Sequence, residues 1–318
     1  MGLEPSSKRP KVAIGLPVYN GARYLRDALD GILAQRFEDF EVLISDNGSV
    51  DDTEAICRDY AARDARIKYV RQAENLGAAH NFNYVFHHTS APYFRWAAHD
   101  DIMDVDYLGD CVEAFDADAG DGVLTYPQTM RIDATGQQLG VFPDPVLAED
   151  LDPAQRLAAL IAPADPKMSL AIMCFPVFGL VRRDILEKTS LIANFPRSDT
   201  LLIVELALWG RWIAIEAPHF LRREHDEGSV ISAEKAATGL ERERLLAEWF
   251  DPSRKGRFPA TRTRLALGYV AATLKPPMPL AMRLKCLWIA LGWLGRHARL
   301  IRGEVRILAT EWVRRRLP

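Results

Sequence analysis

Two adjacent carboxylates, Asp100 and Asp101, follow an apolar segment in the stretch "PYFRWAAHDD". Burying two such charges together without a counter-charge is unfavourable. A divalent cation removes that cost, and Mg²⁺ or Mn²⁺ prefers oxygen ligands that it shares with a substrate diphosphate. The alternative is that Asp101 or Asp104 caps a following helix over "VDYLGDCVEAF", which would explain only one acid of the pair. The pair therefore favours a metal site.

A second group of polar residues lies in "ISDNGSVDDT" at 44–53, where another apolar segment ends. Asp46 and Asn47 begin what would be an ordinary turn. Asp51 and Asp52 suit the start of the next helix, where their charge favours the positive end of the helix dipole. Taken alone, this stretch is a capped turn.

The elements around these residues alternate between strand and helix over the first 130 residues. Segments rich in β-branched and aromatic residues predict strands, and apolar residues spaced by three or four predict helices. Strands are expected at 11–18, 40–45, 66–72 and 92–98, and helices at 22–37, 51–64 and 77–88. Short links between alternating strands and helices indicate right-handed crossovers and a parallel sheet.

Polar residues follow each of these four strands. They are Asn20 and the segments 46–52, 72–77 and 99–101. The carboxyl ends of parallel strands share one edge of the sheet, and ligands of open α/β sheets bind at that edge. One acidic loop could be accidental, but four polar strand ends on a common edge predict a ligand site.

The pattern changes after residue 122. We expect a hairpin with its turn at 133–136, a helix near 153–161, a strand leading into a helix over 174–189, a helix over 198–212, a strand over 213–225, and helices beyond 233. The whole chain is therefore α/β, with a helical C-terminal region.

Composition is that of a soluble globular protein, with 48% hydrophobic and 26% charged residues in 318. The net charge of −3 conceals an asymmetry: residues 281–318 carry +7 and the remainder −10. The basic segment combines Leu, Ile and Trp with Arg at helical spacings, which suits the interface of an anionic membrane. The alternative is a helical pair that packs on the body or on a second subunit.

Four cysteines, Cys57, Cys111, Cys174 and Cys286, are scattered without metal-binding spacing. We expect free, buried thiols in a reducing compartment. The N-terminal segment lacks the apolar stretch of a signal peptide, and no run approaches the roughly 20 apolar residues of a membrane span. The expected location is the cytoplasm, with a peripheral position on the inner face of the membrane left open.

Four motifs occur in a specific order: "PVYN" at 17–20, "ISDNGSVDDT" at 44–53, "NLGAAHN" at 75–81 and "HDD" at 99–101. Together they resemble glycosyltransferase family 2, which has the GT-A fold. The resemblance covers about residues 10–230. It implies a Rossmann-like mixed sheet flanked by helices, with a helical C-terminal extension.

The resemblance also implies a division of the chain. A GT-A domain is expected over 1–232, with its nucleotide-binding half at about 10–120 and its acceptor half at about 121–232. Residues 233–318 form the helical C-terminal region, which would associate with a membrane or a partner.

The resemblance assigns a nucleotide pocket and a Mn²⁺ or Mg²⁺ site. The nucleotide-sugar is implied to contact Pro17, Tyr19, Asn20, Asp46, Asn47, Asn75, Gly77 and Asp100. Asp101 corresponds to the direct metal ligand and Asp100 to the carboxylate that contacts ribose or metal. Asn47 stands where the family usually has the second Asp of Asp-Asp-Gly-Ser, so a UDP-sugar is favoured and dTDP- and GDP-sugars stay open. His99 replaces a commoner acidic residue.

In this family a carboxylate near a helix start acts as the base in an inverting transfer. "FPRSDTLLIVELALWG" offers Asp199 at the helix start and Glu205 two turns later, and we favour Asp199, whose alternative role is a helix cap. "LRREHDEGS" at 221–229 contains the Arg-x-His common at this point of the family. This motif would make His225 an additional metal ligand. The alternative is that the stretch is only a surface loop. Arg222 or Arg223 would neutralise phosphate.

The implied function is sugar transfer from a nucleoside-diphosphate sugar to a hydroxyl of a saccharide or lipid-linked saccharide, in cell-surface polysaccharide or glycolipid synthesis. No nucleic-acid partner is expected, and a homo-oligomer stays open. One alternative is a non-catalytic sugar-nucleotide-binding protein. Another is a sugar-1-phosphate nucleotidyltransferase, which needs a Gly-rich loop with an Arg after the first strand, and "GLPVYNGAR" lacks that run. An HD-type phosphohydrolase needs its His/Asp pairs on helices, whereas "HDD" at 99–101 follows a predicted strand.

Overall fold

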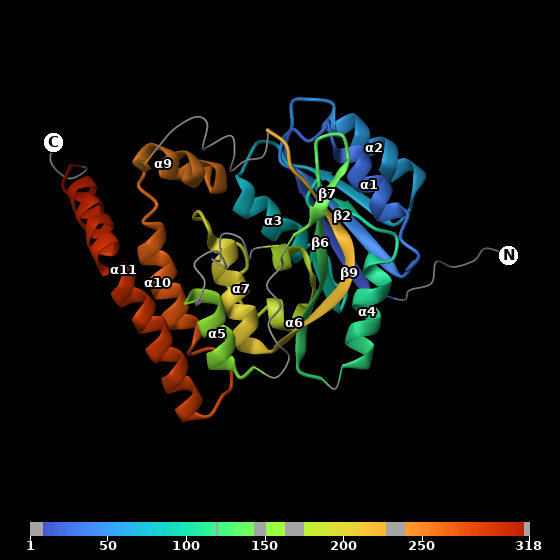
Figure 1. Cartoon of the computed structure of the whole chain (residues 1–318). Coiled ribbons are helices and arrows are strands. Elements are labelled where there is room, and N and C mark those ends of the chain that lie inside the picture. Colours follow the sequence, from blue (N-terminus) through green and yellow to red (C-terminus); the bar gives the residue numbers. More distant parts are fainter. Residues whose placement is uncertain (1–8, 119, 143–150, 163–174, 227–238, 315–318) are drawn as a thin grey trace.

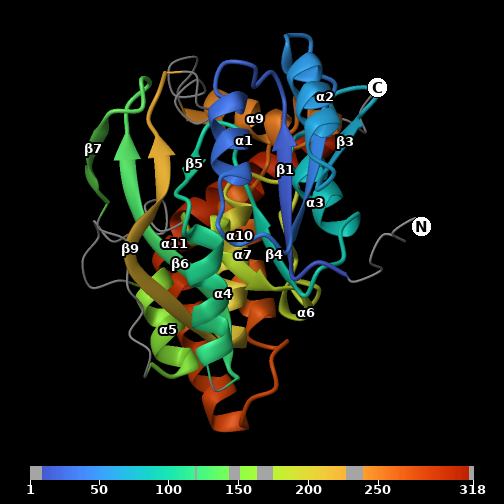
Figure 2. The same cartoon turned by 90° about the vertical axis from the view of Figure 1, so that its right-hand side faces the viewer.

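A mixed β-sheet with the strand order β3-β2-β1-β4-β8-β6-β9-β5 runs through the molecule. The computed structural model describes residues 9–118, 120–142, 151–162, 175–226 and 239–314. Helices cover both faces of the sheet (Figure 1). One buried hydrophobic cluster joins the sheet to α1, α2 and α4, and a second joins it to α3, α5, α7, α10 and α11. Figure 2 shows α1 and α4 on the near side of the sheet, with α10 and α11 on the far side.

The first half of the sheet is parallel, as the sequence predicts. Its strands are β1 (Val12–Val18), β2 (Phe40–Asp46), β3 (Ile67–Arg71) and β4 (Tyr93–Trp96), and its helices are α1 (Leu25–Leu33), α2 (Thr53–Arg63) and α3 (Ala78–His87). Every residue of β1 is buried, which is typical of a strand covered on both faces. The four polar strand ends therefore meet at one edge.

The second half adds antiparallel strands and makes the sheet mixed. Its elements are β5 (Ile102–Met103), α4 (Tyr107–Ala117), β6 (Gly122–Ile132), β7 (Gln138–Val141), α5 (Pro153–Ile161), β8 (Leu180–Arg182), α6 (Arg183–Leu186), α7 (Ser198–Trp209) and β9 (Arg211–Arg223), with a 3-10 turn at Phe175–Phe178. Strand β8 is antiparallel to both β4 and β6, and β6 is parallel to β9. Consequently β9 ends at the same edge as β1 to β4.

The short strand β5 was not expected from the sequence. It lies directly after Asp101 and pairs antiparallel with β9, with Ile102 opposite Leu221. Helix α4 starts only at Tyr107, with Asp106 in the cap position. The alternative in which Asp101 caps this helix is therefore wrong, because the pairing with β9 holds Asp101 at the sheet edge.

The C-terminal region is helical, as predicted, within the residues described. It contains α9 (Gly239–Phe250), a 3-10 turn at Pro252–Arg254, α10 (Thr261–Ala272) and α11 (Leu280–Arg314). Tyr269 and Trp293 meet edge to face, with ring centroids 5.2 Å apart, in the same cluster as Phe94 and Trp96 of the sheet. Within the described ranges, none of the helices combines the length and the apolar character that crossing a bilayer requires.

The cysteines that the structure describes, Cys57, Cys111 and Cys286, are free and buried, as predicted. Cys174 lies outside the described residues. Burial raises the pKa of the Cys57 and Cys111 thiols to about 12. Both therefore remain protonated and act as small apolar core residues.

Glu304 of α11 caps the N-terminus of α10. Its side chain is 4% exposed and accepts hydrogen bonds from the backbone N–H groups of Arg262 and Thr263 at 3.1 and 2.8 Å. The cap position of α10 is Ala260, which has no side-chain oxygen to offer. Because the first N–H groups of a helix lack partners within it, Glu304 supplies from another helix what a cap residue would supply locally.

We predict that Glu304→Ala lowers the free energy of unfolding by about 1 to 2 kcal/mol, as loss of a helix cap does. Glu187→Ala, which removes an exposed acid after α6, is the control and should change it by less than about 0.5 kcal/mol. Urea unfolding followed by circular dichroism measures both. Equal stability of the two variants would contradict the capping role.

Candidate functional site

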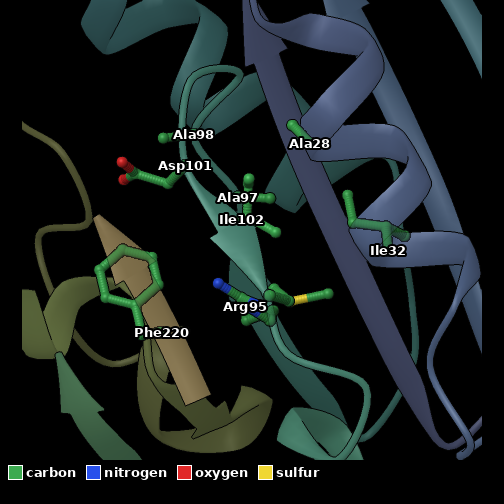
Figure 3. A pocket seen from close by; sticks show the side chains of 9 residues that line it. Ala28, Ile32, Arg95, Ala97, Ala98, Asp101, Ile102 and Phe220 are labelled. Atoms are coloured by element: carbon green, nitrogen blue, oxygen red, sulfur yellow. The ribbon is translucent and has the colours of Figure 1, made fainter. Parts of the chain in front are cut away.

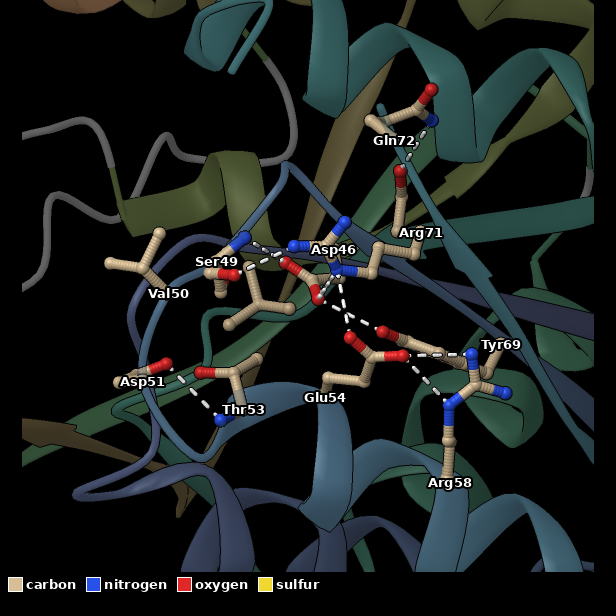
Figure 4. Close-up of polar contacts among 12 residues, drawn as sticks. Asp46, Ser49, Val50, Asp51, Thr53, Glu54, Arg58, Tyr69, Arg71 and Gln72 are labelled. Carbon is tan, nitrogen blue, oxygen red and sulfur yellow. Dashed lines mark hydrogen bonds and ion pairs between the residues drawn. The ribbon is translucent and has the colours of Figure 1, made fainter. Parts of the chain in front are cut away.

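Asp46, at the end of β2, shapes the loop that follows it. Its carboxylate is fully buried and accepts hydrogen bonds from the Ser49 backbone N–H at 2.8 Å and the Tyr69 hydroxyl at 2.9 Å (Figure 4). Burial and the hydrogen bond to Asp46 raise the pKa of Tyr69, so the hydroxyl remains a donor. Gly48 has a φ of 76°, a conformation that glycine adopts without strain. Asp46 thus fixes a tight turn.

Asn47 joins this loop to the "NLG" segment. Its amide nitrogen donates to Asn75 Oδ1 at 2.9 Å and to the Gly77 carbonyl at 3.2 Å, while its Oδ1 accepts from the Leu76 N–H at 3.0 Å. The structure therefore brings together three residues that the sequence assigned to the nucleotide pocket. Both amide protons are used within the protein, so the side chain braces the two loops.

The loop after β1 packs on the same turn. Asn20 has a φ of 51°, donates its N–H to Ser49 Oγ at 2.8 Å and accepts from the Val50 N–H at 2.9 Å. Pro17 is buried within β1, whereas the side chain of Tyr19 is 40% exposed. Of these residues, Tyr19 is therefore the one that presents a ring at the sheet edge.

Asp51 connects the β1 loop to α2. Its carboxylate accepts hydrogen bonds from the N–H groups of Ala22 and Thr53, each at 3.1 Å. Burial alone would raise the pKa of Asp51, but these hydrogen bonds outweigh it and lower the pKa. Thr53 is the first residue of α2 and Asp52 is in its cap position, which places both acids at the helix start as predicted.

The acidic pair after β4 lies against the end of β9. Asp100 Oδ2 is 2.9 Å from His225 Nε2, and Asp101 Oδ1 accepts the Arg223 N–H at 2.9 Å. His99 lies beside Gly21 of the β1 loop, where a Cβ would be 2.6 Å from the imidazole ring. The structure therefore unites the predicted "HDD" and Arg-x-His motifs, 125 residues apart for the His225–Asp100 contact.

The two carboxyl groups of this pair have pKa values shifted in opposite directions. Burial and the neighbouring Asp100 raise the pKa of Asp101 to about 8. Burial would also raise the pKa of Asp100, but the hydrogen bond from His225 and the nearby His99 lower it. Without a cation, Asp101 is therefore mostly protonated at neutral pH, and the negative charge of the pair lies on Asp100. Among the described residues, no group of three or more His, Cys, Asp or Glu side chains forms a ready-made metal cage.

His225 is buried beside the ring of Tyr24, at a centroid distance of 4.7 Å. Its Nε2 is bonded to Asp100, and its Nδ1 has no hydrogen-bond partner in the part of the chain that the structure describes. In this arrangement His225 orients the Asp100 carboxylate. Ligation of a metal through Nε2 would require that hydrogen bond to break.

Arg223 connects several segments of the chain at the site. Its side chain is 1% exposed, and it donates to the Asp100 carbonyl at 3.0 Å, to Asp27 at 2.8 Å and to the Ala134 carbonyl at 3.2 Å. These contacts join β4, α1 and the hairpin turn to the end of β9. The suggestion that Arg223 neutralises phosphate is therefore wrong for this conformation, because its guanidinium is bound by the protein itself.

Arg95, in the middle of β4, had no role among the residues predicted from the sequence. It is 1% exposed, its guanidinium lies 4.2 Å from the centre of the Tyr107 ring, and it lines a small pocket with Asp101 and Phe220 (Figure 3). Its Nε and Nη1 lack partners among the described residues. A single Arg in an otherwise apolar strand was the available signal, and it marks a buried positive charge close to Asp101.

The two candidate bases occupy different environments on α7. Asp199 is half-buried in the first turn, where it accepts the Thr200 N–H at 2.9 Å, and the cap position belongs to Arg197, so the helix-cap alternative is wrong. Glu205 is 3% exposed, and its carboxylate accepts the Ser190 N–H at 2.7 Å and contacts Lys275.

The direction of α7 separates the two acids further. Helix α7 ends where β9 begins, so its N-terminus points back toward the site edge (Figure 1). Asp199 therefore lies at the end of α7 nearer the site, and Glu205 braces the interior.

The comparisons with known proteins agree with this geometry. The family model for "Glycosyl transferase family 2" matches residues 13–189, more than half of the chain. The chain belongs to this family. Membership of this family sets aside the nucleotidyltransferase alternative.

Curated relatives share only segments of the chain. An uncharacterized glycosyltransferase of Rickettsia bellii is 33% identical over 144 residues, which is 44% of this chain and 20% of the relative. Glycosyltransferase GlyA of Streptococcus pneumoniae is 34% identical over 98 residues, covering 31% of this chain and 14% of that protein. The matched part thus spans a fifth or less of these relatives' own length.

Solved structures share the fold over most of the chain. S. aureus TarS 1–349 in complex with UDP-GlcNAc has a TM-score of 0.60 and 16% identity, covering 89% of this chain and 72% of that chain. Mannosyltransferase PcManGT from Pyrobaculum calidifontis, in complex with GDP-Man and Mn²⁺, has a TM-score of 0.52 and 16% identity, covering 96% and 81%. The GT-A fold predicted from the motifs is confirmed.

We predict that Arg223→Lys lowers the free energy of unfolding by about 2 to 3 kcal/mol, because an ammonium cannot reach all the acceptors that the guanidinium fork satisfies. Arg222→Lys is the matched control, since Arg222 is partly exposed and donates to its near neighbour Glu224 at 3.3 Å. Chemical denaturation measures both. If the free energy of unfolding fell equally in the two variants, the contacts of Arg223 would contribute no more to stability than those of Arg222.

Proposed function

We propose that this glycosyltransferase moves a sugar from a nucleoside-diphosphate sugar to an acceptor hydroxyl with inversion at the anomeric carbon. One observation carries the proposal: Asp100 and Asp101 meet Arg223 and His225 at the sheet edge where the β1 and β2 loops also end. Such an edge can hold a nucleoside on the loops and its diphosphate on the acidic pair.

The residues present fit a divalent cation. Asp101 and Asp100 supply adjacent oxygen donors, which suit Mg²⁺ or Mn²⁺, and a bound cation would favour the ionised form of Asp101. We propose that Asp101 is the direct ligand, that Asp100 contacts metal or ribose, and that His225 either adds a ligand or holds Asp100 in place. When bound, the cation would offset charge on the leaving diphosphate. PcManGT, which shares the fold, was solved with Mn²⁺ beside its GDP-Man.

The donor is proposed to be a UDP-sugar, with dTDP- and GDP-sugars as the other candidates. TarS and PcManGT were solved with UDP-GlcNAc and GDP-Man, respectively, so the shared fold accepts either base. The proposed nucleotide site is formed by Tyr19, Asn20, Asn47, Asn75, Gly77 and Asp100, with the buried Pro17 and Asp46 supporting the loops that carry them. Since both amide protons of Asn47 and its Oδ1 are used internally and the residue is buried, its contribution to base selection would come through the loop that it shapes.

Asp199 is proposed as the general base. It would take the proton of the acceptor hydroxyl while that oxygen attacks the anomeric carbon and the nucleoside diphosphate leaves from the opposite side. It is half-buried in the first turn of α7, at the end of the helix nearer the site, where its Oδ1 accepts the Thr200 N–H. Glu205 is the less favoured candidate, because its carboxylate is already bound by Ser190 and Lys275.

The proposed acceptor is a saccharide or lipid-linked saccharide, in cell-surface polysaccharide or glycolipid synthesis. We propose a cytoplasmic location with peripheral attachment to the inner face of the membrane. Support comes from α11, whose Trp288 is 76% exposed among several basic residues. A homo-oligomer through the same region is the competing arrangement.

Asp101→Asn should abolish sugar transfer and remove the Mn²⁺-dependent part of nucleotide stabilisation, because the amide no longer offers a charged ligand. Melting curves with UDP, GDP, CDP and dTDP, each with and without Mn²⁺, measure the second effect. Asp106→Asn, which changes a surface acid paired with Arg36, is the matched control and should behave as wild type. Retained metal dependence in Asp101→Asn would refute the assignment.

Asp199→Asn should lower turnover by roughly 10²-fold or more and leave nucleotide affinity nearly unchanged, as loss of a general base does. Glu205→Gln should instead lower the melting temperature, because Ser190 and Lys275 lose a charged partner. Steady-state kinetics and calorimetric titration of UDP distinguish the two. An active Asp199→Asn alongside a folded but inactive Glu205→Gln would reverse the choice.

A further inference from the structure

The outer face of α11 is apolar over its first three turns. Leu280, Leu284, Trp288 and Leu291 are 71, 56, 76 and 46% exposed. Their spacing of four, four and three residues places them on one stripe of the helix. Cys286, Ala290 and Trp293, on the opposite side, are buried against the body. Figure 1 shows α11 (red) as the outermost element, with α10 beside it.

The same stripe continues as a basic surface. Arg299, Arg302 and Arg306 follow it at helical spacing and are exposed. The two acids of α11 do not share this face: Glu304 caps α10, and Glu311 contacts Arg244 at 3.0 Å. The charge that α11 presents to solvent is therefore basic.

The neighbouring helix also carries exposed leucines. Leu267 of α10 and Leu274 just after it are 64 and 54% exposed. Helices α10 and α11 are joined by the short segment 273–279 and fastened by Glu304 and by the contact of Tyr269 with Trp293. The surface is consequently a rigid part of the molecule.

A second copy of the chain is a poor match for this face. Pairing two copies through a two-fold axis would set the arginines of one copy against those of the other, or against its Leu and Trp side chains. An anionic bilayer matches both halves, since Leu and Trp enter the boundary of headgroups and acyl chains while guanidinium groups bind lipid phosphates.

We propose that α11, with the adjoining end of α10, is a docking surface for anionic lipid bilayers. Leu280, Leu284, Trp288 and Leu291 insert at the interface, and Arg299, Arg302 and Arg306 contact the headgroups. The helix lies along the surface of the bilayer. This inference deepens the proposed peripheral location and is independent of which donor, metal or base the enzyme uses.

Docking would fix the orientation of the active site, because α11 is packed on the body along α5 and α10. Arg296 of α11 donates to the Ile161 carbonyl at 3.5 Å, and Trp293 lies in the cluster that reaches the sheet. The acceptor side of the enzyme would then keep one fixed height above the lipid surface, which suits an acceptor held in that surface.

The test is co-sedimentation of the full chain with vesicles of phosphatidylcholine alone and of phosphatidylcholine with about one third phosphatidylglycerol. The wild type should bind the anionic vesicles, and high salt should weaken the binding. Leu284→Ser with Trp288→Ser, and separately Arg299→Glu with Arg302→Glu, should each weaken it at least tenfold. Trp249→Ser on α9 and Arg58→Glu on α2, both at exposed positions, are the matched controls.

Melting curves check that each variant folds, and Asp101→Asn should bind vesicles like the wild type although it is inactive. Vesicle binding and sugar transfer are thus measured independently, so either proposal can fail without affecting the test of the other. The proposal is overturned if anionic vesicles do not bind the wild type or if the α11 variants bind as the controls do. A wild-type dimer in light scattering that Trp288→Ser dissociates, without vesicle binding, would assign the face to a second copy.

Discussion

The contact between the end of β9 and the end of β4 is the constraint on which the site depends. Arg223, at the end of β9, makes this contact in two ways. Its backbone N–H donates to Asp101, and its guanidinium donates to the Asp100 carbonyl and to Asp27. Strand β5 exists because the chain after Asp101 pairs back onto β9. Without this contact, two adjacent acids at a strand end would repel each other into solvent. With it, they stay half-buried, Asp101 on the Arg223 N–H and Asp100 on His225.

Most of the fold could be predicted from the sequence because its elements have strong local patterns. The parallel strands β1 to β4 and helices α1 to α3 follow from alternating apolar periods, and the hairpin turn follows from Asp133 and Gly136. Strand β5 could not be predicted, since two residues hold no periodicity. The partners of β9 on the sheet also depend on contacts far along the chain, which local pattern does not encode.

The residues of the site were easier to find than their roles. Motif order placed Asn47, Asn75 and Gly77 together, and the structure joins them, but only the hydrogen bonds reveal that the Asn47 amide is used as a brace. Likewise, the sequence does not distinguish the roles of Asp199 and Glu205. The structure does, because Glu205 is buried and bound to Ser190 and Lys275. Arg95 gave only one signal, a basic residue in an otherwise apolar strand, and its place beside Asp101 depends on the fold.

Gly77 links the nucleotide loop to the C-terminal helices. A Cβ at this position would lie 2.5 Å from the Phe250 carbonyl oxygen, so α9 rests directly on the turn that Asn47 braces. The region after residue 238 is therefore not an interchangeable module. A chimaera that joins this chain's first 226 residues to another relative's tail would have to reproduce the surface around Phe250 and Tyr269, or leave the donor loop without its support.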